Sequence, residues 1–113
     1  MGQRYYRAHQ RFPVRLGAVI VAHRRGRTVR AEVIDLGLGG LAAEADGPLR
    51  HGEAVLIRLE PPDSAQPIEL TGNVAWVAWT DRSSVRVGIH LVEEDEDTLL
   101  PLLHRLGLSV CAV

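Results

Sequence analysis

Residues 14–35, VRLGAVIVAHRRGRTVRAEVID, contain two runs of alternating apolar residues on either side of a short arginine-rich turn. A period of two is typical of a strand that buries one face. The first run covers residues 14–22 and the second covers residues 28–35. Residues 24–27, Arg-Arg-Gly-Arg, have the composition of a turn. The stretch therefore predicts a β-hairpin, in which Val29, Ala31 and Val33 share one face of the second strand.

Four further segments have the same strand-like character. They are residues 41–44, 54–59, 68–79 and 85–92. Gly and Pro residues occur in the first two loops between them, and residues 81–84 form a polar turn. Within residues 68–79, the alternation places Trp76 on the apolar face with Val74, and it leaves Trp79 partly exposed at the strand end. Six short strands indicate a small antiparallel barrel or sandwich. Because a barrel leaves no exposed strand edge, we expect a mostly β protein with a six-stranded antiparallel β-barrel.

The C-terminal part of the chain has a different period. Four leucines recur at helical spacing, namely Leu99, Leu102, Leu103 and Leu106. Thr98 is the expected N-cap, which would put Pro101 in the first turn, and Gly107 is the expected C-cap. We therefore predict a short amphipathic helix that closes over the barrel.

Length and charge complete the outline of the domain. With 113 residues, the chain is expected to form one domain. We divide it into a flexible arginine-rich arm, residues 1–12, and a barrel domain, residues 13–113. All 13 basic residues are arginine, and eight of them precede Glu32, which indicates an anionic partner for the N-terminal part. No apolar run approaches ~20 residues, so we expect no membrane insertion and a cytoplasmic protein.

No enzyme signature is present in the sequence. The five histidines are scattered, and there is neither a phosphate-binding glycine loop nor a nucleophile motif. Cys111 is the single cysteine, so the chain has no disulfide framework and no thiolate metal site. We therefore expect a binding protein with no enzymatic activity, no cofactor and no metal.

Two short motifs stand out. Arg7 and Arg11 form an Arg-x-x-x-Arg pair just before the first strand, and residues 35–40, Asp-Leu-Gly-Leu-Gly-Gly, follow the second strand. Further on, residues 72–76 read Gly-Asn-Val-Ala-Trp and residues 86–91 read Arg-Val-Gly-Ile-His-Leu. In this order, the four motifs resemble those of the PilZ domain, a bacterial receptor module for cyclic di-GMP. The resemblance covers roughly residues 4–106.

This resemblance implies a single-domain cyclic di-GMP receptor of the PilZ split-barrel type. The implied ligand-binding residues are Arg7, Arg11, Asp35, Gly37 and Gly40. The arm would wrap over the ligand, become ordered, and signal to a separate partner protein, as segment ordering often does. Arginine binds phosphate and the O6/N7 edge of guanine, while a carboxylate accepts from guanine N1–H and N2–H. Asp35 would therefore select guanine over adenine.

One position departs from the family pattern. Gly37 stands where the second motif has serine, so a hydroxyl contact near the ligand is lost. Gly37, Gly39 and Gly40 would bring the backbone close to the ligand, or they would serve a loop that needs positive φ. A lost neutral hydrogen bond costs about 0.5–1.5 kcal/mol, which weakens binding by up to about tenfold.

Two alternatives remain open from the sequence. The chain could keep this fold with little or no cyclic di-GMP binding and act as a protein-interaction adaptor. It could instead be a small barrel that binds RNA or single-stranded DNA through the basic arm. The second alternative is disfavoured, because only five aromatic residues are present to stack on bases.

Overall fold

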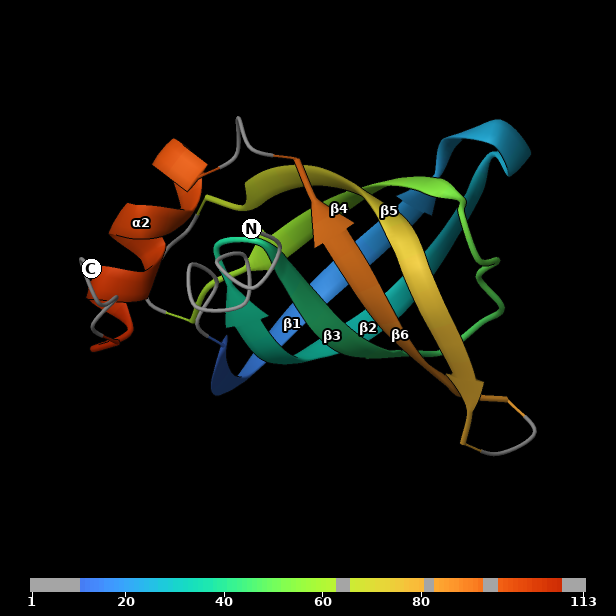
Figure 1. Ribbon diagram of the computed structural model, residues 1–113, viewed down its shortest axis with the longest axis horizontal. Coiled ribbons are helices and arrows are strands. Elements are labelled where there is room, and N and C mark those ends of the chain that lie inside the picture. Colours follow the sequence, from blue (N-terminus) through green and yellow to red (C-terminus); the bar gives the residue numbers. More distant parts are fainter. Residues whose placement is uncertain (1–10, 63–65, 81–82, 93–95, 109–113) are drawn as a thin grey trace, which may run out of the picture.

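The computed structural model describes residues 11–62, 66–80, 83–92 and 96–108. Its elements are β1 (Arg11–Ala22), η1 (His23–Arg25), β2 (Arg27–Gly37), β3 (Gly40–Ala45), β4 (Ala54–Glu60), β5 (Ile68–Trp79), β6 (Val85–Leu91) and α2 (Glu96–Arg105). The strands form a closed barrel in the order β1-β2-β3-β6-β5-β4, and every neighbouring pair is antiparallel (Figure 1). The predicted barrel is thus confirmed.

The first hairpin has the predicted turn. A short 3-10 helix, η1, leads to Gly26, which has a left-handed φ of 59° and whose N–H donates to His23 O at 3.1 Å. Glycine adopts this conformation without the steric cost that a Cβ brings. At the other end of the hairpin, β1 begins at Arg11, earlier than the expected start after Pro13. Arg11 is therefore a strand residue.

The barrel interior is filled by the apolar residues of each alternation. Fully buried side chains come from every strand and include Ile20, Val33, Leu41, Ile57, Leu70 and Ile89. Leu99, Leu102 and Leu103 of α2 belong to the same buried cluster. Figure 1 shows α2 beside the barrel end where β1 begins, while the η1 hairpin projects at the opposite end. The predicted helix thus covers one end of the core.

The helix α2 begins before the predicted N-cap, Thr98, and it ends at the predicted C-cap, Gly107. The helix begins at Glu96, so Thr98 lies inside it and Pro101 lies beyond the first turn. Gly107 has a φ of 78°, and its N–H donates to His104 O at 3.0 Å. The Leu108 N–H donates to Leu103 O at 2.9 Å. These two bonds form a Schellman motif, which confirms Gly107 as the C-terminal cap. Within the described residues, no helix has the length and apolarity to cross a membrane.

Two register shifts change which side chains face outward. One lies between Val33 and Asp35 in the β2–β3 pairing, and the other lies between Val74 and Trp76 in the β5–β6 pairing. A bulge of this kind bends a strand and re-aims the side chains that follow it. Trp76 is consequently 44% exposed, so its predicted place on the apolar face is wrong. Trp79 is 64% exposed, as expected for the strand end.

Candidate ligand-binding site

Arg11 and Asp35 come together on the outer surface of the barrel. Arg11 is the first residue of β1, and the Arg11 Nη1 group donates to Asp35 Oδ1 of β2. Their side chains are 43% and 34% exposed, so both remain accessible to a ligand. A carboxylate has about four acceptor positions on its two oxygens. Asp35 can therefore hold Arg11 and still accept hydrogen bonds from a base.

The outward direction of Asp35 depends on the bulge in β2. Val29 and Val33 are buried, and a strict alternation would point Asp35 into the barrel with them. The register shift after Val33 breaks that phase, so Leu36 becomes the buried residue and Asp35 is half-buried on the outside. Because of the bulge, Asp35 does not point into the core, where burying a carboxylate without partners would cost free energy.

Gly40 is required by a close approach of two other groups. A Cβ at this position would lie 2.6 Å from Ile89 O on β6 and 3.0 Å from Arg11 Nη2. The Arg11 guanidinium therefore lies across the bare backbone of Gly40. Because a larger residue would push the guanidinium away, Gly40 lets Arg11 lie beside Asp35.

The interpretation that this glycine cluster needs positive φ is wrong. Among the described residues, positive φ occurs at Gly26, Gly52 and Gly107. Residues 37, 39 and 40 are absent from that set, so their backbones do not require glycine for its left-handed conformation. At Gly40 the reason is the space that a Cβ would occupy.

Gly37 lies directly opposite Arg11 in the β1–β2 ladder. Residues opposite each other in an antiparallel pair project to the same face. A serine at position 37 would therefore put its hydroxyl beside the Arg11 guanidinium. The missing hydroxyl thus falls inside the candidate site.

Four of the five predicted site residues are brought to one patch of the barrel wall: Arg11, Asp35, Gly37 and Gly40. The fifth, Arg7, lies outside the described residues. The patch combines a forked cation and a carboxylate with two glycines that carry no side chain. Such a set can bind an anion that also has a hydrogen-bonding edge.

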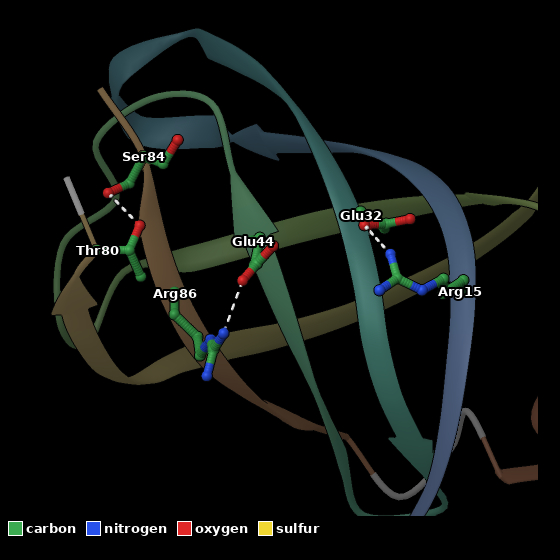
Figure 2. A network of polar contacts seen from close by, with 6 residues as sticks. All are labelled: Arg15, Glu32, Glu44, Thr80, Ser84 and Arg86. Carbon is green, nitrogen blue, oxygen red and sulfur yellow. Dashed lines mark hydrogen bonds and ion pairs between the residues drawn. The ribbon is translucent and has the colours of Figure 1, made fainter. Parts of the chain in front are cut away.

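Other ion pairs on the barrel wall give a useful contrast. Arg15 pairs with Glu32 at 3.2 Å between β1 and β2, and Arg86 pairs with Glu44 at 2.7 Å between β6 and β3 (Figure 2). Exposed pairs of this kind contribute about 0–1 kcal/mol to stability. The contrast lies at Gly40, where the Arg11 guanidinium lies against a backbone without a side chain. Within the described residues, no group of three or more His, Cys, Asp or Glu residues is arranged to hold a metal ion.

The closed barrel, its terminal helix and the exposed Arg11–Asp35 pair define a small antiparallel β-barrel domain. The sequence matches the PilZ domain family over residues 5–106. This chain belongs to the PilZ domain family, which is a family of ligand-binding receptor and adaptor domains. A comparison with curated proteins found no match.

Solved structures show the same fold. The PilZ domain of YcgR from Escherichia coli, solved with c-di-GMP, has a TM-score of 0.65 and 15% sequence identity, covering 88% of this chain and 92% of that one. The Bacillus subtilis inhibitor of motility MotI/DgrA has a TM-score of 0.62 and 17% identity, again over 88% of this chain. YcgR from Escherichia coli in complex with c-di-GMP has a TM-score of 0.62 and 16% identity over 88% of this chain. This chain covers 50% of the MotI/DgrA chain and 46% of that YcgR chain.

Proposed function

We propose that this chain is a cyclic di-GMP receptor that binds the dinucleotide at the Arg11–Asp35 patch. The observation that carries the proposal is the convergence of Arg11, Asp35, Gly37 and Gly40 on one outer face. Membership of the PilZ family and the c-di-GMP-bound YcgR structures support the choice of ligand. Arg7 completes the site from the N-terminal arm. Ordering of the arm that precedes β1 over the ligand then passes the signal to a separate protein.

The chemistry of the patch suits a guanine dinucleotide. Arg11 can form paired hydrogen bonds with phosphate oxygens or with guanine O6 and N7. Asp35 can accept from the N1–H and N2–H groups of guanine while Arg11 holds its carboxylate in place. Adenine presents an acceptor at N1, which would face the carboxylate and repel it.

Isothermal titration calorimetry with cyclic di-GMP tests the proposal directly. We expect saturable binding at micromolar or lower concentration, about −8 kcal/mol or better. Cyclic di-AMP and a random single-stranded oligonucleotide serve as competitors at physiological salt. If the oligonucleotide displaces cyclic di-GMP, nucleic-acid binding replaces the receptor function. Absence of heat with cyclic di-GMP would leave the adaptor function.

Gly37→Ser is expected to tighten binding. The added hydroxyl lies on the face that Arg11 occupies and can donate to a phosphate or base. One neutral hydrogen bond corresponds to an affinity gain of up to about tenfold. Calorimetry of the variant and of Gly37→Ala separates the hydroxyl from the added carbon, since only serine should improve binding. Equal affinities for the two variants would contradict the placement of the motif.

Asp35→Ala is expected to reduce discrimination against cyclic di-AMP. The variant lacks the acceptor for guanine N1–H and N2–H, and its affinity for cyclic di-GMP should fall because Arg11 also loses its partner. The decisive quantity is the ratio of dissociation constants for the two dinucleotides. If that ratio is unchanged, Asp35 orients Arg11 and does not read the base.

A further inference from the structure

A hollow of about 220 Å³ lies where η1 meets the loop that joins β3 to β4. Figure 1 shows the η1 hairpin and this loop at the end of the barrel that α2 does not cover. We name this feature the basic hollow, and its lining residues are Arg24 of η1 and Arg50, His51, Gly52 and Glu53 of the loop. It therefore lies away from the Arg11–Asp35 patch.

The loop that carries Arg50 and His51 has a hydrogen-bonded backbone. The Glu53 N–H donates to Arg50 O at 3.1 Å, and Gly52 has a φ of 82°, the positive value that the third residue of a type II turn requires. The turn is joined to β5, because the Gly52 N–H donates to Val74 O at 2.7 Å and the Val74 N–H donates to Glu53 O at 2.9 Å. Arg50 and His51 therefore project from a backbone that these three bonds hold in place.

The guanidinium groups of the basic hollow differ from those of the barrel wall in their partners. Within the described residues, five arginines pair with a carboxylate, namely Arg11, Arg15, Arg30, Arg58 and Arg86. Across that same part of the chain, neither Arg24 nor Arg50 has a carboxylate partner, and both residues are exposed. Two forked cations therefore line the hollow with their charge unneutralised by an ion pair.

The one carboxylate of the basic hollow contacts the backbone of the turn. Glu53 Oε1 accepts the Arg50 N–H at 2.9 Å, and Glu53 is half-buried. Two guanidinium groups and this carboxylate leave the lining with one net positive charge. The imidazole of His51 adds a further N–H donor, and it carries a positive charge when it is protonated. The hollow therefore presents hydrogen-bond donors and positive charge to a ligand.

The size and donor set of the hollow select the kind of anion. Arginine binds phosphate through two parallel hydrogen bonds, so two guanidinium groups suit an anion with more than two oxygens. A phosphate monoester has three terminal oxygens and a charge of about −1.5 to −2 near pH 7, whereas a carboxylate has two oxygens and one charge. Sites for drug-sized ligands measure about 300–1,000 Å³, so a hollow of about 220 Å³ accommodates one phosphate group with a small substituent.

We propose that the basic hollow is a second ligand site of this protein, which binds the phosphate group of a small phosphate monoester. Arg24 and Arg50 hold the phosphate oxygens with their guanidinium forks, and His51 donates from its imidazole. Arg11 begins β1 and η1 follows the last residue of that 12-residue strand, so the two sites lie on the order of 35 Å apart along the strand. The inference therefore does not rest on the proposed function, and the two ligands can be bound at the same time.

NMR titration of the isotope-labelled protein with glycerol 3-phosphate, at constant ionic strength, tests the site. We expect saturable shifts of the backbone amides of Arg24, His51 and Gly52, with a dissociation constant on the order of 1 mM. Arg24→Ala and Arg50→Ala should each weaken binding by about tenfold or more, because each removes charge-assisted hydrogen bonds. Glu53→Gln should tighten binding by up to about fivefold, since the amide oxygen still accepts the Arg50 N–H while the negative charge is gone.

Arg58→Ala is the matched control for the two arginine variants. Arg58 is exposed on β4, pairs with Glu69 at 3.2 Å and lies outside the hollow, so its loss removes the same charge. Its dissociation constant should stay within about twofold of the wild-type value, as expected for a surface charge away from the ligand. Acetate is the control for the anion, and it should bind at least about tenfold more weakly than glycerol 3-phosphate. Thermal melting of each variant confirms that it is folded.

Each outcome decides for or against the second site. Weaker binding in Arg24→Ala and Arg50→Ala, with Arg58→Ala unchanged, supports it. Shifts that do not saturate, equal losses in all three variants, or equal binding of acetate and glycerol 3-phosphate would overturn it. Arg11→Ala should keep the shifts in the hollow, and their loss would place the phosphate at the Arg11–Asp35 patch instead. Failure of cyclic di-GMP to bind would overturn the proposed function and leave this site standing.

Discussion

Replacing Arg11 with alanine is expected to lower cyclic di-GMP affinity by about a hundredfold or more. The substitution removes charge-assisted hydrogen bonds, each worth about 1.5–3 kcal/mol, and it leaves Asp35 as an unpaired anion at the site proposed for the anionic ligand. Arg11→Lys keeps the charge without the planar fork, so it should recover only part of the affinity. Calorimetry with cyclic di-GMP on wild type, Arg11→Ala and Arg11→Lys measures the three affinities.

Arg15→Ala is the matched control for this experiment. Arg15 lies on the same strand and pairs with Glu32 of β2, as Arg11 pairs with Asp35, but its side chain is 80% exposed compared with 43% for Arg11. Both substitutions should change the free energy of unfolding by less than about 1 kcal/mol. Only Arg11→Ala should lose the ligand. Equal losses in the two variants would reduce the role of Arg11 to its contribution to overall charge.

Gly72→Val is expected to cause the largest loss of stability. Position 72 faces the barrel interior between Leu70 and Val74, where the alternation would accept an apolar side chain. A Cβ there would lie 2.4 Å from His90 O and 2.9 Å from Ile89 Cγ2. Because one of these atoms belongs to the backbone of β6, it cannot move without opening the ladder. Overpacking of this kind costs about 1–3 kcal/mol or more.

Urea denaturation measures the effect, and Asn73→Val is its control. The neighbouring Asn73 is exposed on the same strand, so the same new side chain at that position should change the free energy of unfolding by no more than about 0.5 kcal/mol. A loss of about 3 kcal/mol at Gly72 would lower the melting temperature by on the order of 10 °C. Equal stability of the two variants would show that β5 and β6 separate easily at this point.

Much of the fold follows from local patterns. The alternation in residues 14–35 predicts both strands of the first hairpin, and Gly26 supplies the left-handed turn between them. Residues 68–79 form β5 with the predicted bounds. Gly107 ends α2 as predicted. These features depend on side-chain period and on the conformational freedom of glycine, which are local properties that a sequence carries.

The geometry of the candidate site could not be predicted from the sequence. Ordered motifs nominate Arg7, Arg11, Asp35, Gly37 and Gly40, and they leave open whether the glycines approach a ligand or adopt positive φ. The structure shows that Gly40 makes room for Arg11 and for Ile89 O of β6, a neighbour far away in sequence. The start of α2 was also missed, because Thr98 has the chemistry of an N-cap but the helix begins at Glu96.

The sequence by itself determined the six strands, the hairpin turn and the helix cap, and it nominated the residues of the candidate site. Only the tertiary structure decided which way Asp35 and Trp76 face. In each case a register shift, after Val33 and after Val74, turns outward a residue that strict alternation would bury. Alternation is a property of one strand, whereas a bulge arises from its pairing with the neighbouring strand. For that reason the direction of the carboxylate and of the indole is set by β3 and β6, and it cannot be found from β2 or β5 alone.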